Sequence, residues 1–342
     1  MESPTDTERV GNEAAVEAIL GRLGALRAEI GKVIVGQGAV VEQLLVGLLA
    51  GGHCLLEGVP GLAKTLMIRT LGDALHLSFK RIQFTPDLMP SDILGTEILE
   101  EEHGSGRRVF RFNRGPIFAN LVLADEINRS PPKTQAALLE AMQEVEVTFA
   151  GHTYELERPF FVLATQNPIE QTGTYPLPEA QLDRFLLNLR IDYPSWEEEL
   201  QILAHTTGDR VARVEAVMSG EEVRRAQRMV RQVHISSALV EWVARLTRAS
   251  RPGESGIAAV EEYVEWGAGP RAGQALILAG KARALLSGRF SVTLDDLRGL
   301  VPPVLRHRLL VNFRGQAERV TAEAIARQIL EGTPAPQSPL GG

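Results

Sequence analysis

The segment from residue 53 to residue 75 restricts the fold more than any other part of the chain. An apolar run, His53-Cys54-Leu55-Leu56-Glu57, predicts a buried strand, and the spacing of apolar residues over 64–75 predicts a helix soon after it. Between them stands a glycine-containing loop, Gly58-Val59-Pro60-Gly61-Leu62-Ala63-Lys64-Thr65. This loop follows the pattern G-x-x-x-x-G-K-[ST] except at Ala63. Strand, loop and helix in this order predict a phosphate-binding turn in an α/β fold.

The residues of this loop have distinct predicted roles. Its glycines let backbone N–H groups turn inward toward phosphate oxygens. Lys64 is expected to neutralise the β- and γ-phosphates of a nucleotide, and the Thr65 hydroxyl to hold Mg²⁺. We therefore predict ATP and Mg²⁺ as ligands, with the nucleotide contacted by Gly58, Val59, Pro60, Gly61, Leu62, Ala63, Lys64, Thr65 and Leu66. The alternative is an ordinary glycine-rich turn with a surface lysine.

Strand signals recur through the first half of the chain. Apolar runs predict strands at 79–84, 121–124, 160–165 and 186–191, with helical patterns between several of them. Alternating segments at 93–112 and 145–157 predict two β-hairpins, for which surface loops are the alternative. The predicted fold class is α/β, with a P-loop parallel sheet core and β-hairpin insertions over residues 13–205.

Helical patterns replace strand signals from about residue 195. We predict linker helices over 206–235 and a small all-α domain over 236–331, from helical patterns at 196–205, 220–233, 236–249, 270–287, 293–305 and 320–331. Two more helices are predicted before the first strand, at 13–32 and 38–49. The polar N-terminus, residues 1–12, and the proline-containing tail, residues 332–342, are predicted to be disordered.

The predicted strand at 121–124 is followed by two carboxylates, Asp125 and Glu126. Open parallel sheets bind ligands at the carboxyl ends of their strands, where the phosphate loop also begins. Asp125 is expected to hold Mg²⁺ through water, and Glu126 to polarise the water that attacks the γ-phosphate. A solvated pair of acids at a strand end is the alternative.

Three polar residues further along complete a predicted catalytic set with Lys64 and Glu126. Asn167 follows the strand at 160–165, where an amide can bridge the attacking water and the γ-phosphate, although Asn-Pro also forms turns. Arg184 precedes the last strand and can stabilise phosphoryl transfer, often in a neighbouring subunit. Arg271 stands in the first turn of a predicted helix, where the helix dipole opposes a cation, so an anionic partner is favoured. The alternative for Arg184 is a local ion pair with Asp183 or Glu179, and the alternative for Arg271 is an ordinary surface arginine.

Composition narrows the class of protein. The 342 residues include 36 lysines and arginines against 43 acids, and a net charge of −7 argues against a broad nucleic-acid-binding face. The single cysteine, Cys54, permits no intramolecular disulfide and is expected in the core. No signal peptide or membrane span is predicted, so a cytoplasmic location is expected. The seven histidines lack metal-ligand spacing, so a metal enzyme is not expected.

Together these motifs resemble the MoxR-type AAA+ ATPases over roughly residues 30–330. The resemblance rests on Val35-Gly36-Gln37, the phosphate loop in its Ala63 form, Leu123-Ala124-Asp125-Glu126-Ile127-Asn128-Arg129, Ala164-Thr165-Gln166-Asn167-Pro168, Pro176-Leu177-Pro178-Glu179-Ala180-Gln181-Leu182-Asp183-Arg184-Phe185 and Gly269-Pro270-Arg271. It implies that the helical domain is an AAA+ lid and that the hairpins are the helix-2 insert and the pre-sensor hairpin. It also implies that Gly36 and Gln37 lie near the adenine, that Arg184 is an arginine finger, and that Arg271 is the lid sensor.

The same resemblance implies a function. The expected protein is an ATP-hydrolysing, chaperone-like remodelling motor that forms a homo-oligomeric, hexameric ring, with ATP between the α/β domain and the lid. A partner with a von Willebrand factor A domain and a protein client are implied, in complex maturation or metal-cofactor insertion. Three alternatives are a DNA-associated AAA+ motor, a subunit similar to the magnesium-chelatase motor, and a nucleotide-gated binding module with little turnover.

Overall fold

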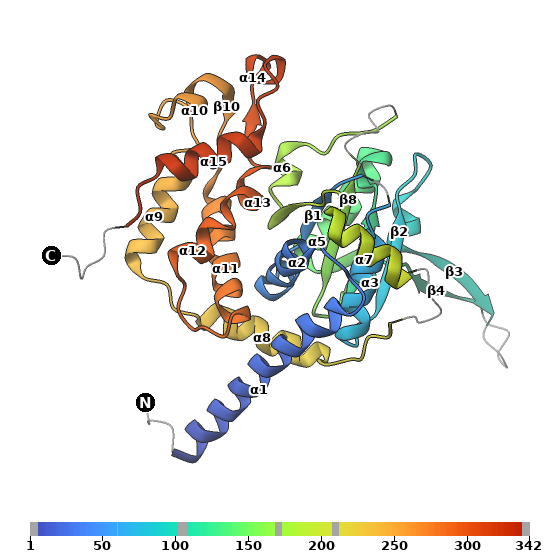
Figure 1. Cartoon of the computed structure of the whole chain (residues 1–342). Coiled ribbons are helices and arrows are strands. Elements are labelled where there is room, and N and C mark those ends of the chain that lie inside the picture. Colours follow the sequence, from blue (N-terminus) through green and yellow to red (C-terminus); the bar gives the residue numbers. More distant parts are fainter. Residues whose placement is uncertain (1–5, 60, 102–107, 168–172, 207–211, 337–342) are drawn as a thin grey trace.

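A computed structural model shows an α/β core and a helical lid that lie side by side (Figure 1). It describes residues 6–59, 61–101, 108–167, 173–206 and 212–336. The core contains α1 (Asp6–Gly31), α2 (Gly38–Ala50), β1 (Cys54–Glu57), α3 (Lys64–Ala74), β2 (Phe79–Gln83), α4 (Pro90–Leu94), β3 (Gly95–Glu101), β4 (Arg108–Arg114), β5 (Leu121–Asp125), η1 (Ile127–Arg129), α5 (Pro132–Glu144), β6 (Glu146–Phe149), β7 (His152–Glu155), β8 (Phe161–Gln166), α6 (Glu179–Leu182), β9 (Leu187–Arg190) and α7 (Trp196–Thr206).

Five of these strands form one parallel sheet in the order β2-β5-β8-β1-β9. The five strands predicted from the sequence are therefore confirmed, within one or two residues at their ends. The phosphate loop follows β1 in the interior of the sheet, and β5, which ends at Asp125, lies two strands away. This order brings the loop and the acidic pair to the same edge of the sheet, as the predicted chemistry requires.

Alternate residues of the central strands enter two different hydrophobic clusters. Leu121, Leu123, Leu163 and Leu56 face the helices α1, α2 and α3, together with lid residues, in one cluster. Their neighbours along the strands face α5 and α4 in the other. Because both faces are covered, the strands are continuously apolar. Cys54 is fully buried here, as predicted.

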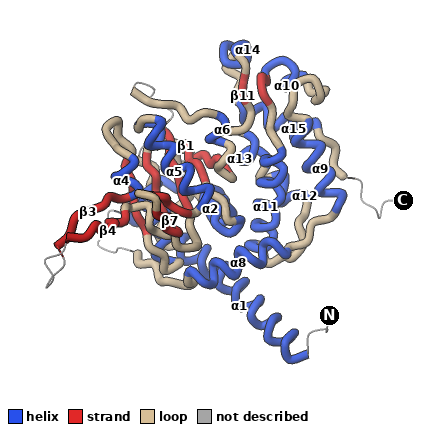
Figure 2. Tube along the Cα trace, turned by 180° about the vertical axis from the view of Figure 1, so that it is seen from behind, coloured by secondary structure: helices blue, strands red, loops and turns tan. Residues whose placement is uncertain are grey.

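The two predicted hairpins are present and are joined by aromatic contacts. β3 pairs with β4 and β6 pairs with β7, each pair antiparallel. The β3–β4 hairpin projects from the core (Figure 2). At its base, Phe112 stacks on Tyr154 of β7 with ring centroids 4.4 Å apart and lies 5.2 Å from Phe149 of β6. The predicted turn of the first hairpin lies outside the described residues.

The lid is helical, as predicted, but it also contains strands that the sequence did not predict. It comprises α8 (Gly220–Gln232), α9 (Ser237–Arg248), α10 (Ala258–Tyr263), β10 (Val264–Trp266), α11 (Pro270–Leu286), α12 (Leu294–Arg298), α13 (Val301–Leu305), β11 (Leu310–Val311), α14 (Phe313–Ala317) and α15 (Ala322–Gly332). β10 and β11 form a small antiparallel pair. Strands of three and two residues are too short for a period-two pattern, so the prediction of an all-α domain missed them.

Several predicted boundaries need correction. The single helix predicted at 293–305 is two helices, because Pro302 and Pro303 fit the start of a new helix better than the interior of an old one. Disorder over 1–12 is wrong from Asp6 onward, where α1 begins. Of the linker helices predicted over 206–235, α8 is present, while 212–219 form no helix and 207–211 lie outside the described residues.

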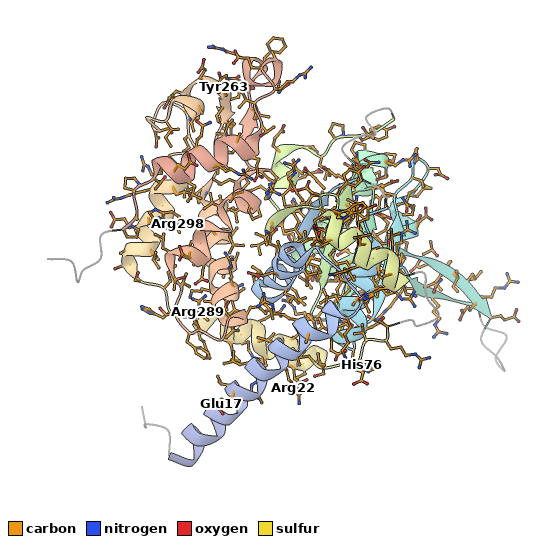
Figure 3. All side chains as sticks on the ribbon, viewed as in Figure 1. Glu17, Arg22, His76, Tyr263, Arg289 and Arg298 are labelled. Atoms are coloured by element: carbon orange, nitrogen blue, oxygen red, sulfur yellow. The ribbon has the colours of Figure 1, made fainter. Side chains whose placement is uncertain are left out.

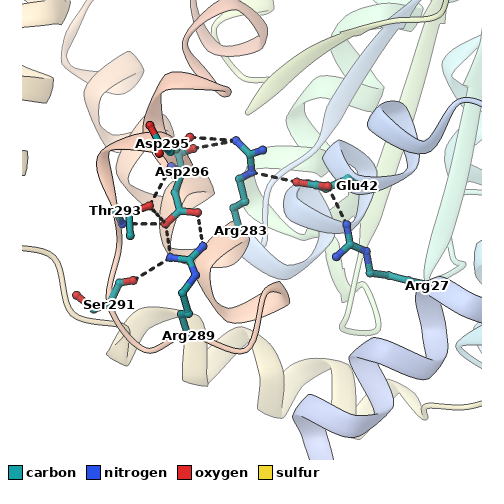
Figure 4. A network of polar contacts seen from close by, with 8 residues as sticks. All are labelled: Arg27, Glu42, Arg283, Arg289, Ser291, Thr293, Asp295 and Asp296. Carbon is teal, nitrogen blue, oxygen red and sulfur yellow. Dashed lines mark hydrogen bonds and ion pairs between the residues drawn. The ribbon is translucent and has the colours of Figure 1, made fainter.

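A continuous apolar cluster and several ion pairs join the lid to the core. Glu42 of α2 accepts hydrogen bonds from Arg27 of α1 at 2.8 Å and from Arg283 of α11 at 3.0 Å (Figure 4). Arg283 also donates to backbone carbonyls of α12. Another bridge pairs Arg22 of α1 with Glu222 of α8. These contacts give the lid a defined position against α1 and α2.

A second junction joins the lid to β9. After α13, Arg306 donates to the Asn188 carbonyl at 3.0 Å, and the ring of His307 contacts the Phe185 carbonyl at 3.1 Å. The buried Arg308 donates to Asp183 Oδ1 at 2.7 Å and to the Phe185 carbonyl at 2.7 Å.

Within the described residues, no helix has both the length and the apolar character needed to cross a bilayer.

His53, just before β1, is a buried histidine held in its neutral form. Its Nδ1 accepts from the Val162 N–H at 3.0 Å, so Nε2 carries the proton and donates to the Met142 carbonyl at 3.0 Å. Burial lowers the pKa of His53 from 6.5 to about 4. The assignment of His53 as a structural residue is supported by these two backbone bonds.

We expect His53 to make folding stability depend on pH. Because its pKa is lower in the folded state, the unfolded chain binds the proton first, and stability falls as the pH drops through the range from 6.5 to about 4. Between pH 7 and pH 5 this residue should remove about 2 kcal/mol from the free energy of unfolding. Urea unfolding at both pH values measures the loss.

The matched variant is His53→Asn, whose side-chain oxygen can still accept from Val162 N–H but does not titrate. Its stability should change by about 2 kcal/mol less between the two pH values than that of the wild type. Burial also lowers the pKa of His307, so some acid sensitivity remains in the variant. Equal pH dependence in both proteins would contradict the assignment.

Candidate functional site

Two adjoining pockets lie on either side of the phosphate loop. The first, which we call the phosphate pocket, has a volume of about 430 Å³ and is lined by Gly61, Ala63, Lys64, Thr65, Leu66, Arg81, Gln83, Asp125, Glu126 and Asn167. The second, the apolar pocket, has a volume of about 530 Å³ and is lined mainly by Val33, Ile34, Val35, Leu62, Met67, Tyr193, Pro194, Ile202 and Leu203. Gly61, Ala63 and Leu66 line both. One polar and one apolar compartment suit the two ends of a nucleotide.

The phosphate loop takes the backbone form that its glycines favour. Gly61 has φ 87°, and Ala63, at the start of α3, has φ 55°. An alanine in this left-handed region is strained by about 1–2 kcal/mol, which explains why glycine is usual at this position. Val59 and Leu62 lie in the loop as predicted, whereas Pro60 is outside the described residues.

Lys64 lies partly buried across the loop. Its Nζ donates to the Gly58 carbonyl, and burial lowers its pKa, while the nearby Asp125 and Glu126 carboxylates act in the opposite direction. The ammonium group therefore lies in the same pocket as both carboxylates, as predicted. Thr65 follows it in the first turn of α3, where backbone N–H groups point toward an anion.

Asp125 is held by two side chains from neighbouring strands. Thr165 of β8 donates its hydroxyl to Oδ1 at 2.7 Å, and Arg81 of β2 donates to Oδ2 through Nη2 at 2.6 Å and Nε at 3.0 Å. These bonds fix the orientation of the carboxylate in the pocket. The hydroxyl of Thr65 and the carboxylate of Asp125 are oxygen donors lining one cavity, which is the donor set that Mg²⁺ prefers.

Glu126 is held by a separate set of donors. Gln83 Nε2 and Arg129 Nη1 each donate to its Oε2 at 3.0 Å, and its own N–H donates to Thr165 Oγ1 at 2.9 Å. Its φ of 57° lies in the left-handed region, which turns the residue out of the line of β5. Such strained residues occur often at functional sites. Asn167 lies at the end of β8 and lines the same pocket, as predicted.

Four residues that hold the acidic pair were not predicted from the sequence: Arg81, Gln83, Thr165 and Arg129. Arg81 and Gln83 lie on β2, which the sequence marks as a strand without revealing its neighbour. The register Gln83↔Asp125 places them beside the acidic pair. Thr165 and Arg129 belong to the motifs at 164–168 and 123–129, yet nothing in their residue types distinguishes a carboxylate partner from a surface residue.

Gly36 and Gln37 lie next to the apolar pocket. Gln37 lines it, adopts φ 55°, and donates through Nε2 to the Asp192 carbonyl at 2.8 Å. Gly36 has φ 69°, and a Cβ there would lie 2.7 Å from the Glu198 side chain. A side chain at this position would therefore require the Glu198 side chain of α7 to move.

Arg184 and Arg271 lie together, away from the phosphate loop. Both line a third pocket of about 240 Å³, with Asp183 and Arg308. Arg271 Nη1 lies 3.7 Å from Asp183 Oδ2, and Arg184 Nη1 donates to the Leu139 carbonyl at 2.9 Å. Among the described residues, none beyond Ala212 lines the phosphate or the apolar pocket. That ATP lies between the core and the lid stays a prediction, since no described lid residue lines either pocket in this arrangement.

Comparisons with known proteins agree with this architecture. A family model described as the ATPase family associated with various cellular activities (AAA) matches residues 53–187, and an AAA lid domain model matches residues 257–329. The chain thus has the two parts of an AAA-type P-loop ATPase in the predicted order.

Relatives over nearly the full length define the family more closely. Chaperone MoxR1 of Mycobacterium tuberculosis is 42% identical over 336 residues, covering 98% of this chain and 88% of its own. Protein MoxR of Methylorubrum extorquens is 30% identical, covering 90% and 93%. A crystal structure assigned as an ATPase of Cytophaga hutchinsonii has a TM-score of 0.88 at 41% identity, covering 96% and 98%. The chain belongs to the MoxR-type AAA+ ATPases.

Proposed function

We propose that this protein hydrolyses Mg²⁺-ATP and acts as a chaperone-like remodelling motor. The observation that carries the proposal is the convergence of Lys64, Thr65, Asp125, Glu126 and Asn167 on one pocket, with an apolar pocket beside it. A binding module would need only the loop and the apolar pocket. The presence of a positioned acid, Glu126, in the phosphate pocket favours hydrolysis.

Each residue of the phosphate pocket has a proposed task. Backbone N–H groups of the loop and the ammonium of Lys64 bind the phosphates, and the apolar pocket with Gln37 receives the base. Gln83 and Arg129 both occupy Oε2 of Glu126, so we assign the attacking water to Oε1. Asn167 orients the same water. Thr65 and Asp125 would hold Mg²⁺, which neutralises charge on the β- and γ-phosphates when it is bound.

The two arginines are proposed to act on a neighbouring subunit. Arg184 and Arg271 line one pocket of their own chain, and neither lines its nucleotide pockets. Both therefore can serve a triphosphate only if a second copy presents its phosphate pocket to them. This supports a homo-oligomeric ring, for which we propose six subunits. It also means that Arg271, like Arg184, would act on the nucleotide of a neighbouring subunit.

Mixing two inactive variants tests this arrangement. Arg184→Ala should bind nucleotide normally but hydrolyse ATP at least 10²-fold more slowly, because the transition-state charge loses a cation. Glu126→Gln should be inactive for a different reason. In mixed rings, some sites combine the intact Glu126 of one subunit with the intact Arg184 of the next, so phosphate release should reappear.

The mixing ratio provides the control. Restored turnover should peak near equal amounts of the two variants and vanish when either is omitted. Arg271→Ala should behave like Arg184→Ala in the same mixture. If mixed assemblies form but no phosphate is released at any ratio, action in trans is contradicted.

The partner and client are proposed from the family resemblance. We propose a partner with a von Willebrand factor A domain and a protein client, in complex maturation or metal-cofactor insertion. A Glu126→Gln protein held with ATP should retain its partners longest, so purifying it and identifying what stays bound tests this assignment. Recovery of the same proteins with Lys64→Ala, which should not bind ATP, would contradict nucleotide-dependent binding.

A further inference from the structure

An apolar surface lies on the outward side of α7. Tyr193, Trp196 and Leu200 are 74%, 69% and 48% exposed. Trp196 and Leu200 are four residues apart and therefore share one face of the helix. Large apolar side chains grouped on an exposed helix face mark an interaction site. We call Trp196 and Leu200, together with Tyr193 just before the helix, the α7 face.

The α7 face adjoins the apolar pocket of the nucleotide site. Tyr193 lines the apolar pocket, and so does Leu203, which follows Leu200 by three residues and is 53% exposed. The apolar pocket in turn shares Gly61, Ala63 and Leu66 with the phosphate pocket. The α7 face therefore lies beside the nucleotide site, on the side of the apolar pocket.

We infer that the α7 face receives the neighbouring subunit of the ring, whose Arg184 and Arg271 reach the phosphate pocket. This inference rests on the proposed action of both arginines in trans. The copy that supplies them must cover the phosphate pocket, and α7 lines the apolar pocket that adjoins it. The occupant is therefore a second copy of this chain.

Charge favours the same occupant. The first turn of α7 carries Glu197, Glu198 and Glu199. The opposing surface carries Arg184 and Arg271, both exposed, and its acid Asp183 is already paired with Arg271 and Arg308. An acidic helix end beside an apolar anchor thus meets a basic surface, and such complementarity orients the two partners.

The positions of the two surfaces fit a ring. α7 lies on the side of the core away from lid helices α9 and α15, whereas α6, which precedes Arg184, lies next to the lid (Figure 1). The contact is therefore between two different surfaces of the same chain. Contacts of this heterologous kind build rings when the rotation closes.

Replacing one exposed tryptophan tests the inference. Trp196→Ser, made in the Glu126→Gln background with Mg²⁺-ATP, should need at least 10-fold more protein for half-assembly, as measured by sedimentation velocity. Buried interface tryptophans are often hot spots, which supports an effect of this size. Affinity for a fluorescent ATP analogue should stay within about 3-fold, because Trp196 does not line either nucleotide pocket.

Trp266→Ser is the matched control. Trp266 is 74% exposed and lies on the lid in β10, three residues after Tyr263, which Figure 3 places at the far end of the lid. This variant should assemble like its parent. Assembly of Trp196→Ser at parental concentrations would overturn the inference, as would equal losses in both variants or a parent that does not assemble.

The assembly measurement requires no hydrolysis, so it separates the inference from the proposed function. A wild type that forms rings through Trp196 but releases no phosphate would overturn the proposed ATPase and leave the α7 contact standing. Normal rings in Trp196→Ser that fail to retain a client held by the parent would assign the α7 face to that client and overturn the inference.

Discussion

Glu126→Gln is expected to lower the rate of ATP hydrolysis by 10²–10⁴-fold while leaving nucleotide affinity within a few-fold of the wild type. Glutamine preserves the shape of the side chain but cannot accept a proton from water, and general-base catalysis contributes rates of this order. Phosphate release under saturating ATP measures the first quantity, and titration of a fluorescent analogue measures the second. A separation of the two effects is the signature of a residue that acts on water and not on ATP.

The donors around Glu126 sharpen this expectation. Gln83 and Arg129 each donate to Oε2 at 3.0 Å, and a glutamine at 126 can still offer them a carbonyl oxygen in that place. The pocket should therefore keep its shape, and the lost rate should reflect chemistry alone. Glu331→Gln, the same substitution on an exposed residue of α15, should turn over at the wild-type rate. Full activity in Glu126→Gln would assign the base elsewhere.

The sequence predicted the parts of the nucleotide site that depend on one segment at a time. The loop at 58–65 and the acidic pair after β5 are each marked by strong local patterns, and the strands before them are long apolar runs. Their meeting at one edge of the sheet follows from the general rule for parallel sheets. The left-handed backbone of Ala63 was not predicted, although it is the conformation that the usual glycine would favour.

The sequence could not predict which separate segments would be brought together. Arg81 contacts Asp125 because β2 neighbours β5, and strand order leaves no mark on either strand. The placement of Arg271 depends on how the whole lid packs against α1 and α2, through an apolar cluster that no single motif encodes. A residue pattern could identify Arg271 as a candidate, but only the packing shows that it lies with Arg184.

Arg308 is expected to be the most important single charge for the junction between lid and core. Its side chain is 3% exposed, and it donates to Asp183 Oδ1 at 2.7 Å and to the Val304 and Phe185 carbonyls at 2.6 and 2.7 Å. Burial lowers its pKa, and Asp183 opposes that effect, so the pair is balanced only while both members are present. Arg308→Ala should lower the free energy of unfolding by about 3 kcal/mol, because it leaves a half-buried carboxylate and several carbonyls without their hydrogen-bond donor.

Denaturant unfolding measures this loss, and Arg248→Ala provides the comparison. Arg248 also pairs with an acid, Glu254, at 2.9 Å, but both side chains are at least 48% exposed, so its removal should cost under about 1 kcal/mol. The loss of stability in Arg308→Lys should lie between those of Arg308→Ala and Arg248→Ala. An ammonium group keeps the charge but lacks the planar guanidinium that reaches several acceptors. Equal stability of Arg308→Ala and Arg248→Ala would contradict the role of the junction.

Asp183 links Arg308 to the two arginines proposed to act in trans. One of its carboxylate oxygens binds Arg308, the other lies next to Arg271, and the residue directly precedes Arg184. Loss of Arg308 should therefore also disturb the two arginines that we propose act on the neighbouring subunit.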